Sequence, residues 1–257
     1  MDLKKSIFVI VAILMICSIG FGQGQRIWLA TVYPQGFYGL SYNPNNNRVY
    51  YLNVRANVIS IVSSDSLFTS LGTIPTPNND TMFTDIKYCA YDNTFWLLNM
   101  QLKRVYKINT SGTVLRSFPL SALDYAVGLA WDNDTRTIYI ADRRTAGNAT
   151  PKYIYVFDTL GTQIRRMNHP VSTPWFGPRC LTFAPRSGTR PAMLLNAYTF
   201  FNSSQALDSA GVFALNPQNC QVLNYFRVQP VDTCNIRGIE YDPRNNTYWV
   251  SLYQYGT

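Results

Sequence analysis

The hexapeptide GLAWDN at Gly128–Asn133 is the phrase from which the fold can be predicted. It places an apolar and a small residue before an aromatic side chain, and a turn follows at once. The same arrangement recurs at four other places: Gly39–Pro44 (GLSYNP), Tyr88–Asn93 (YCAYDN), Cys180–Pro185 (CLTFAP) and Gly238–Pro243 (GIEYDP). Repeats at intervals of about 40 to 60 residues indicate supersecondary units that stack to bury a shared core.

Each repeat predicts four short strands. The recurring phrase is the first, and an aromatic or β-branched run such as Ile138–Ala141 follows the turn as the second. Third and fourth strands are predicted at Val58–Val62 and Leu67–Leu71, Arg104–Ile108 and Val114–Phe118, Tyr153–Phe157 and Gln163–Met167, and Val212–Leu215 and Val222–Val228. Apolar residues show no sustained helical period. The predicted fold class is therefore all-β, a β-propeller of four-stranded antiparallel blades.

The two ends of the chain predict how the propeller closes. A strand at Arg26–Val32 is followed by Pro34, and a proline also follows each predicted fourth strand. We therefore interpret Arg26–Val32 as a fourth strand whose three partners come from the C-terminal part of the protein. The fifth repeat has only two predicted strands before Thr257. Five blades are recognisable, and we expect a C-terminally truncated chain and six blades in the complete protein.

The repeats resemble those of six-bladed propellers of the NHL-repeat, SMP-30/gluconolactonase and strictosidine-synthase-like type. The similarity lies in fold and repeat style, and it is strongest where Ile138–Asp142 (IYIAD) is followed by Tyr153–Thr162 (YIYVFDTLGT). A propeller of this type can serve as a binding module or carry an enzymatic site. The resemblance therefore implies the fold and leaves the function to be argued from particular residues.

The alternative function implied by this resemblance is that of a metal-dependent lactonase. Such an enzyme would hold one divalent cation, such as calcium, with a Glu, an Asn and an Asp. The candidates are Glu240, the only glutamate in the chain, with Asn196 and Asp142 at the ends of second strands. However, Asn53 and Asn99 occupy the same position in other repeats, which favours a local role in bonding turn backbone. The main prediction is therefore no enzymatic activity and no cofactor.

The composition of the chain argues against a metal site or a catalytic triad built on histidine. His169 is the only histidine, so a site with several histidine ligands cannot form. It precedes Pro170 in a predicted loop, and the chain contains no Gly-x-Ser-x-Gly motif that would accompany a catalytic triad. We therefore assign no catalytic residue.

The N-terminus has the pattern of a signal peptide over residues 1–22. Lys4 and Lys5 precede the apolar run Ile7–Cys17, and Gly20–Gly22 fits a small-x-small cleavage site. The apolar run is shorter than the roughly 20 residues that span a bilayer. We expect export to a secreted, periplasmic or cell-surface location, no membrane span in the mature chain, and a propeller domain over residues 23–257.

Charge and cysteine content narrow the class of partner. The chain has 22 Lys and Arg against 14 Asp and Glu, a net charge of +8, but the basic residues occur singly rather than in runs. This distribution argues against a nucleic-acid groove. Of the cysteines after the signal peptide, Cys89 and Cys180 are predicted to be buried, and Cys180 with Cys234 is the one disulfide that the topology allows.

The predicted ligand surface lies where the repeats become irregular. The connection between second and third strands lengthens to Asp142–Tyr153 in the third repeat and Asn196–Gly211 in the fourth. The aromatic and cationic residues expected on this face are Arg143, Arg144, Trp175, Phe176, Arg179, Tyr198, Phe200, Phe201 and Arg237. We predict that they bind a protein or glycan. Two alternatives remain: the aromatics only pack the loops, or the repeats are a structural part of a longer surface protein.

Overall fold

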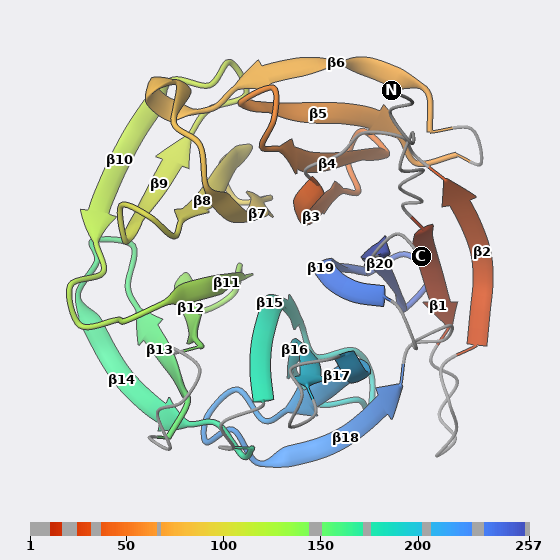
Figure 1. Cartoon of the computed structure of the whole chain (residues 1–257), viewed down its shortest axis with the longest axis vertical. Helices are drawn as coiled ribbons and strands as arrows, with labels where there is room; N and C mark the ends of the chain where they lie inside the picture. The colour runs from red at the N-terminus through yellow and green to blue at the C-terminus, as the bar shows by residue number, and fades with distance from the viewer. Residues whose placement is uncertain are drawn as a thin grey trace, which may run out of the picture.

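The computed structural model describes residues 11–16, 25–31, 37–65, 68–143, 151–171, 176–201, 207–227 and 234–254. Within these ranges it contains five four-stranded antiparallel sheets, arranged as blades in a ring (Figure 1). One short 3-10 helix, Pro77–Asn79, joins the first blade to the second. The β-propeller predicted from the repeats is confirmed.

Four blades are built from consecutive strands, each running from the centre of the ring outward. The first contains β3 (Phe37–Asn43), β4 (Arg48–Asn53), β5 (Val58–Ser63) and β6 (Ser70–Pro75); the second β7 (Phe83–Cys89), β8 (Thr94–Asn99), β9 (Arg104–Ile108) and β10 (Val114–Pro119). The third contains β11 (Ala126–Asp132), β12 (Thr137–Asp142), β13 (Tyr153–Phe157) and β14 (Gln163–Asn168); the fourth β15 (Phe176–Ala184), β16 (Met193–Phe201), β17 (Leu207–Leu215) and β18 (Val222–Arg227).

The fifth blade combines the two ends of the described chain. Its order is β19 (Cys234–Asp242), β20 (Thr247–Gln254), β1 (Val11–Ile16) and β2 (Gln25–Thr31). The prediction that the strand near Ile27 is the outer strand of this blade is confirmed. The third strand of the blade differs from the prediction: it is β1, whereas we expected a strand from the C-terminal part of the protein. β1 lies inside the predicted signal peptide; cleavage of that segment and a sixth blade both stay predictions.

Described side chains also close the ring between the last blade and the first. Arg237 Nη1 donates to the hydroxyl of Tyr38 at 3.0 Å, and Arg244 Nη1 donates to Asn47 Oδ1 at 2.6 Å. The inner strands adjoin in the cyclic order β3, β7, β11, β15, β19 and β3 again. Closure therefore does not depend on β1 and β2 alone.

The hydrophobic core lies between neighbouring blades. Between the second and third blades, the indoles of Trp96 and Trp131 lie 5.8 Å apart, and Phe118 and Phe157 pack beside them. Tilted aromatic pairs at such distances stabilise a fold by about 0.5 to 1.5 kcal/mol beyond their burial. The aromatic residue of each repeat therefore holds one blade against the next.

The second copy of the repeated phrase was placed in the wrong register. Cys89 pairs with Thr94 as Asn43 pairs with Arg48, so the equivalent segment is Asp85–Cys89 (DIKYC) rather than Tyr88–Asn93. The Tyr88 hydroxyl donates to Asn93 Oδ1, five residues later. Tyr42 with Asn47 and Tyr241 with Asn246 repeat this bond in the first and fifth blades. The true copy was missed because it carries an aspartate and a lysine where other repeats have small residues.

Three other expectations are corrected. The segment Asn196–Gly211 is not a long loop, because β16 and β17 extend through it and pair out to Phe201 and Leu207; its aromatic and β-branched residues favour strand. β6 begins at Ser70 instead of Leu67, because Phe68 has a positive φ and packs 5.9 Å from Trp249. Cys180 is a free, buried thiol, so the disulfide with Cys234 is not formed.

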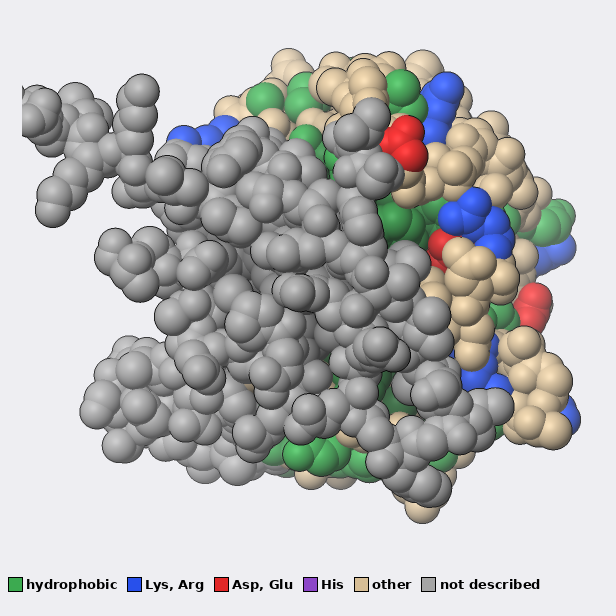
Figure 2. All heavy atoms as spheres, turned by 90° about the vertical axis from the view of Figure 1, so that its right-hand side faces the viewer, with side chains coloured by type: hydrophobic (Ala, Val, Ile, Leu, Met, Phe, Trp, Pro, Cys, Tyr) green, Lys and Arg blue, Asp and Glu red, His purple; other side chains and the backbone are tan. Residues whose placement is uncertain are grey.

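The surface agrees with the dispersed charge of the sequence. On the described part of the side view in Figure 2, Lys and Arg side chains are scattered among acidic and neutral ones. No helix among the described residues is long and apolar enough to cross a membrane.

Candidate functional site

All five inner strands carry a β-bulge near their first residues, on the face that bears the second-to-third-strand loops. A bulge inserts an extra residue and redirects its side chain, and bulges are frequent beside functional sites. The residues left unpaired at these bulges are Gly39 in β3, Thr84 in β7, Val127 in β11, Arg179 and Cys180 in β15, and Arg237 in β19. All of them except Gly39 line one pocket.

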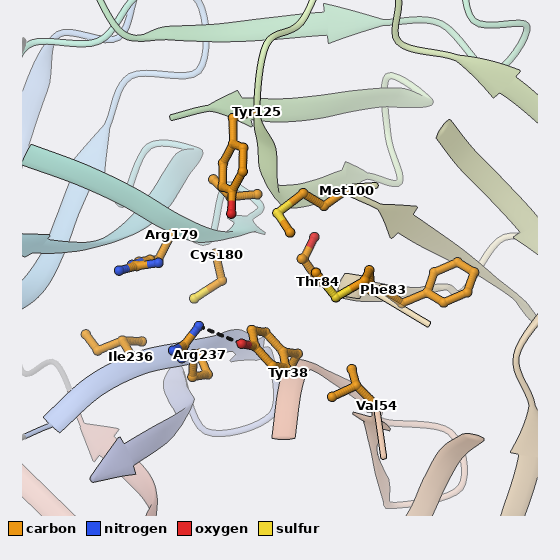
Figure 3. Close-up of a pocket in the computed structure, with 12 residues that line it drawn as sticks. Tyr38, Val54, Phe83, Thr84, Met100, Tyr125, Arg179, Cys180, Ile236 and Arg237 are labelled. Carbon is orange, nitrogen blue, oxygen red and sulfur yellow. Dashed lines mark hydrogen bonds between the residues drawn. The ribbon is translucent and has the colours of Figure 1, made fainter. Parts of the chain in front are cut away.

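This central pocket has a volume of about 160 Å³ and is formed around the axis of the ring (Figure 3). An apolar wall surrounds it, made by Val54, Met82, Phe83, Met100, Val127 and Ile236. Polar groups from Tyr38, Thr84, Tyr125, Arg179, Cys180 and Arg237 complete the lining. An apolar cavity with a few convergent polar groups is the usual form of a ligand site.

Arg237 is held at the pocket by a tyrosine of the neighbouring blade. Besides the hydrogen bond to the Tyr38 hydroxyl, its guanidinium lies 4.7 Å from the centre of that ring. Arg179 is half-buried across the pocket, and the hydroxyl of Tyr125 points toward the centre (Figure 3). Two guanidinium groups therefore lie at the lining of this pocket.

Thr84 brings an unsatisfied polar atom to the same pocket. The residue is 7% exposed, and its hydroxyl oxygen has no hydrogen-bond partner among the described residues. Leaving a buried hydroxyl without a partner costs roughly 1 to 3 kcal/mol, so native structures rarely retain one without a reason. The Thr84 hydroxyl is one of eleven buried side-chain nitrogen or oxygen atoms in this state among the described residues.

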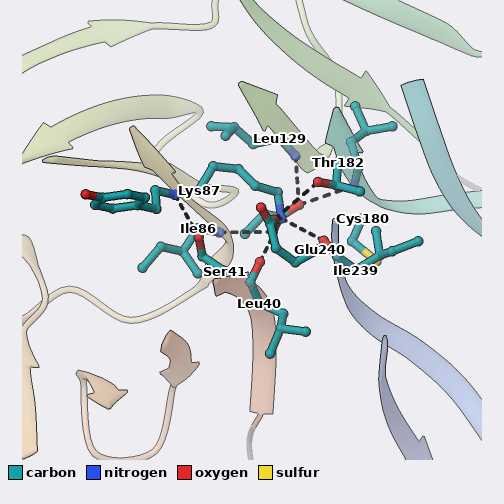
Figure 4. A network of polar contacts seen from close by, with 12 residues as sticks. Leu40, Ser41, Ile86, Lys87, Leu129, Cys180, Thr182, Ile239 and Glu240 are labelled. Carbon is teal, nitrogen blue, oxygen red and sulfur yellow. Dashed lines mark hydrogen bonds and ion pairs between the residues drawn. The ribbon is translucent and has the colours of Figure 1, made fainter. Parts of the chain in front are cut away.

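An ion network joins the inner strands at positions that follow the pocket-lining residues along these strands (Figure 4). The Lys87 ammonium is surrounded by four oxygen atoms: the carbonyls of Leu40 at 2.8 Å and Ile239 at 2.9 Å, and the carboxylates of Asp85 at 3.0 Å and Glu240 at 3.1 Å. Lys87 is 2% exposed. A buried charge needs partners of this kind, because desolvation without them is prohibitive.

Asp85 extends the network to the remaining blades. Its second carboxylate oxygen accepts backbone N–H groups from Leu129 at 2.9 Å and Leu181 at 3.3 Å. The Thr182 hydroxyl donates to Glu240 at 3.2 Å. Each of the five inner strands therefore supplies at least one group to a single polar cluster.

The cluster shifts the proton affinity of its members. Burial alone would lower the pKa of Lys87, but the carboxylates of Asp85 and Glu240 raise it above its ordinary value, so the ammonium stays charged. Burial raises the pKa of Glu240 to about 7, although Lys87 opposes the shift. Glu240 therefore changes its charge near neutral pH.

The structure brings together two residues of the predicted ligand surface, Arg179 and Arg237, in the central pocket. Tyr198 is a correction: it is 2% exposed, because its ring packs against Phe213 at 4.6 Å in the core between the third and fourth blades. Arg143 follows the end of β12, and its backbone N–H bonds the carbonyl of Tyr125. Arg144, Trp175, and the side chains of Phe176, Phe200 and Phe201 lie outside the described residues.

The three residues of the lactonase alternative each have different partners among the described residues. Glu240 faces the Lys87 ammonium, whereas Asp142 accepts the N–H groups of Asp124 and Tyr125. Asn196 bonds the ring of His169 at 2.8 Å and the carbonyl of Cys180 at 3.2 Å. Three separate sets of partners thus engage the proposed ligands.

The turn role predicted for the asparagines is confirmed at Asn53 and Asn99. Their side-chain oxygens accept the backbone N–H groups of Ala56 and Leu102, three residues later in each case.

The only histidine of the chain, His169, is buried, and burial lowers its pKa to about 4. Its ring is therefore neutral at pH 7.

Sequence reasoning missed Asp85, Lys87 and Thr84. A signal was present, since DIK interrupts an otherwise apolar strand with two opposite charges. In the correct register, Asp85 and Lys87 occupy positions of β7 that face the axis of the ring.

Comparisons with known proteins agree on the fold. Solved structures that share it include a chain of Kuenenia stuttgartiensis hydrazine synthase, with 14% identity, a TM-score of 0.54 and coverage of 91% of this chain. This chain spans 59% of that one. A chain from a nidogen/laminin complex has 13% identity and a TM-score of 0.50, covering 86% of this chain and 94% of its own.

Virginiamycin B lyase from Staphylococcus aureus has 17% identity and a TM-score of 0.48, covering 88% of this chain and 69% of its own. No protein-family model matches the chain. No curated protein matches it either. The similarity to the hydrazine synthase and nidogen/laminin chains, at 14% and 13% identity, supports the β-propeller fold alone.

Proposed function

We propose that this chain is an exported, non-catalytic β-propeller of the NHL-like kind, and that it binds a protein ligand through the pocket-bearing face. One observation carries the proposal. Bulges occur near the start of all five inner strands, and four of them place side chains in the lining of a single pocket with two arginines, Arg179 and Arg237. Convergence of this kind concentrates binding groups from every blade at one place.

The chemistry of the lining favours binding over catalysis. The described residues that line the pocket include no carboxylate and no imidazole, which are the usual general bases. Burial also raises the pKa of the Cys180 thiol, so it is a poor nucleophile. By contrast, arginine and tyrosine are the residues that most often dominate the energy of protein interfaces.

A fold neighbour supports the class of ligand by analogy only. A chain in a nidogen/laminin complex aligns with 86% of this chain. Fold alone does not transfer function, so the argument still depends on the pocket itself. The size of the pocket favours a protein over an extended glycan, because about 160 Å³ holds one side chain or a benzene-sized group.

The lactonase alternative is disfavoured by Lys87. An ammonium 3.1 Å from Glu240 already supplies the positive charge that a divalent cation would bring. Lactone hydrolysis with added calcium, measured for the wild type and Glu240→Gln, separates the two functions. A lactonase loses turnover in the variant, whereas the binding module shows no turnover in either form and retains its ligand.

The binding function is tested by capture of partners on the immobilised chain. We expect a protein identified by mass spectrometry to be retained by the wild type and lost by Arg179→Ala and Arg237→Ala. Arg186→Ala is the matched control, since Arg186 is exposed in the turn at the opposite end of β15. Equal capture by all four proteins would contradict the use of this face.

A further inference from the structure

A second pocket lies between the second and third blades, and it shares no lining residue with the central pocket. Its volume is about 270 Å³. Two of its lining residues, Tyr91 and Arg136, belong to the turns that join first and second strands. It therefore lies toward the opposite ends of the inner strands from the bulges, and we call it the interblade pocket.

The apolar part of the interblade pocket is mostly aromatic. Trp96 and Trp131 are buried in the core between the two blades and form its inner wall. Toward the surface, Tyr91 is 60% exposed and Leu115 is 54% exposed. A ligand that covers these two residues removes apolar surface from water, which favours binding.

The same pocket is lined by three basic residues, Lys107, Arg116 and Arg136, and by no carboxylate among the described residues. Lys107 has an ion-pair partner in Asp92, which does not line the pocket. Arg116 and Arg136 form no ion pair with any described residue. Within the described part of the chain, two of the three positive charges are therefore unpaired.

The two unpaired arginines reach across the blade interface in opposite directions. Arg116 extends from β10 and donates from Nη1 to the carbonyl of Thr159 in the third blade at 3.1 Å. Arg136 belongs to the third blade, and its guanidinium lies 4.0 Å from the centre of the Tyr91 ring in the second. The Tyr91 backbone N–H donates to Asn133 Oδ1 at 3.0 Å. These contacts position both guanidinium groups without neutralising them, and they leave most of their N–H donors to a ligand.

Arg136 stands where other blades have an asparagine. The last residue of this turn has a positive φ, and it is Asn47, Asn93 and Asn246 in the first, second and fifth blades, each bonded by a tyrosine hydroxyl. In the third blade Trp131 replaces the tyrosine, and Arg136 has a φ of 55°. Asparagine tolerates this conformation better than arginine does. The turn therefore gives no reason for an arginine, whereas a charge at the pocket does.

The chemistry of the lining selects its occupant. A guanidinium group matches an oxyanion, whose oxygens only accept hydrogen bonds. A sugar presents hydroxyl donors, and the described lining offers neither a carboxylate nor a side-chain amide to accept them. The aromatic walls favour a flat ring. A volume of about 270 Å³ exceeds the roughly 150 Å³ of an engineered cavity that holds benzene, so a ring with one charged substituent fits.

We propose that the interblade pocket binds an aromatic anion, a flat ring that carries one phosphate, sulfate or carboxylate group. The oxyanion lies between Arg116 and Arg136, and the ring packs against Tyr91, Trp131 and Leu115. The same chemistry occurs in a free aryl acid and in a phosphorylated or sulfated tyrosine of another protein. This site goes beyond the proposed function, because it uses none of the residues of the central pocket.

Titration with phenyl phosphate, followed by NMR of the tryptophan indole N–H signals, tests the proposal. We expect the Trp131 signal to shift, and the signal of Trp249, which packs between the fifth and first blades, to stay in place. Inorganic phosphate and phenol each carry one half of the chemistry and should bind about tenfold or more weakly. Equal affinity for inorganic phosphate would overturn the ring contact, and equal affinity for phenol would overturn the oxyanion contact.

Two variants locate the charge. Arg116→Gln and Arg136→Asn should each weaken phenyl phosphate by about tenfold and leave the weak binding of phenol unchanged. Arg136→Asn installs the residue of the other blades, so the turn keeps its conformation and the test stands even if Arg116→Gln fails to fold. Arg186→Gln is the matched control, since Arg186 is exposed in the equivalent connection of the fourth blade. Unchanged affinity in Arg136→Asn, or an equal loss in the control, contradicts the site.

Short peptides that carry phosphotyrosine or sulfotyrosine distinguish the two sources of the ring. Tighter binding of a modified peptide than of phenyl phosphate assigns the pocket to a protein ligand, and weaker binding assigns it to a free aryl acid. The absence of a Trp131 shift with every one of these anions overturns the proposal. Capture through the central pocket is measured separately with Arg179→Ala and Arg237→Ala, so the two proposals can fail independently.

Discussion

Lys87 is the residue on which the centre of the ring depends. Its ammonium contacts Leu40, Asp85, Ile239 and Glu240, and these residues belong to three different inner strands. A buried ion pair contributes little net stability compared with a well-packed apolar replacement, but removing one partner leaves an uncompensated charge. Replacing Lys87 alone should therefore destabilise the fold strongly, because the buried carboxylates of Asp85 and Glu240 remain.

The first prediction concerns Lys87→Met. Asp85 and Glu240 would lose their common cation, and unfolding by urea should show a loss of about 3 to 5 kcal/mol, as for other broken buried pairs. Lys107→Met is the matched control, because Lys107 pairs with Asp92 at a partly exposed site, where about 0 to 1 kcal/mol is expected. Equal losses in the two variants would refute the central role of Lys87.

The second prediction concerns the pH dependence of stability. Burial raises the pKa of Glu240 from 4.5 to about 7 in the folded state, so between these values the folded protein holds a proton that the unfolded chain has released. The contribution of Glu240 is present below about pH 4.5 and is lost as pH rises toward 7.

Urea midpoints of the wild type and Glu240→Gln at several pH values measure this effect. The wild type should lose stability relative to the variant across the window and run parallel to it above pH 7. Parallel curves throughout the range would show that Glu240 titrates normally. Asp85, Lys87, Cys180 and Thr182 face or adjoin the carboxyl group and must be unchanged in both proteins.

At the scale of elements, glycines allow the inner strands to meet at the axis. Gly128 has no room for a side chain, since a Cβ there would lie 2.3 Å from the carbonyl oxygen of Arg179 in the next blade. Gly39 and Gly238 occupy the same position in β3 and β19, again against a neighbouring inner strand. The glycine of the repeated phrase is therefore a requirement of close strand approach.

The third prediction follows from this contact. Gly128→Ala should lower stability by about 1 to 3 kcal/mol, because β11 and β15 must move apart to accept the methyl group. Thermal unfolding monitored by circular dichroism measures the change. Gly188→Asn is the control: Gly188 has φ +56° and no atom within 4 Å of an added Cβ, and asparagine tolerates this conformation. A larger loss in the control would disprove the steric explanation.

The sequence was sufficient to predict the blades, and less so the site. Alternating apolar residues and turn asparagines are local signals, so most predicted strands agree with the structure to within about one residue at each end, and Arg104–Ile108 and Tyr153–Phe157 have the predicted bounds. The roles of Asp85, Lys87 and Thr84 depend on contacts between distant strands; Lys87 and the Ile239 carbonyl are 152 positions apart. Local pattern also could not reveal the bulges, because an extra residue is visible only once the strands are paired.

At the scale of the whole molecule, the fourth prediction concerns the N-terminus. We expect export to remove residues 1–22, so mass spectrometry of the protein secreted by its native host should give a mature chain that begins near Gln23. A mature protein that retains Val11–Ile16 would contradict the signal peptide and would favour β1 as a permanent strand of the fifth blade.

Closure of the ring is the central claim, because the pocket exists only if β3, β7, β11, β15 and β19 surround one axis. A double-mutant cycle with Lys87→Met and Glu240→Gln, measured by urea unfolding at pH 8, tests it most directly. Lys87 and Glu240 come from strands separated by β3, and their side chains meet only across the centre of a closed ring. We predict a coupling of about 1 to 3 kcal/mol that shrinks at pH 5; additivity within about 0.5 kcal/mol at pH 8 would contradict the closed ring.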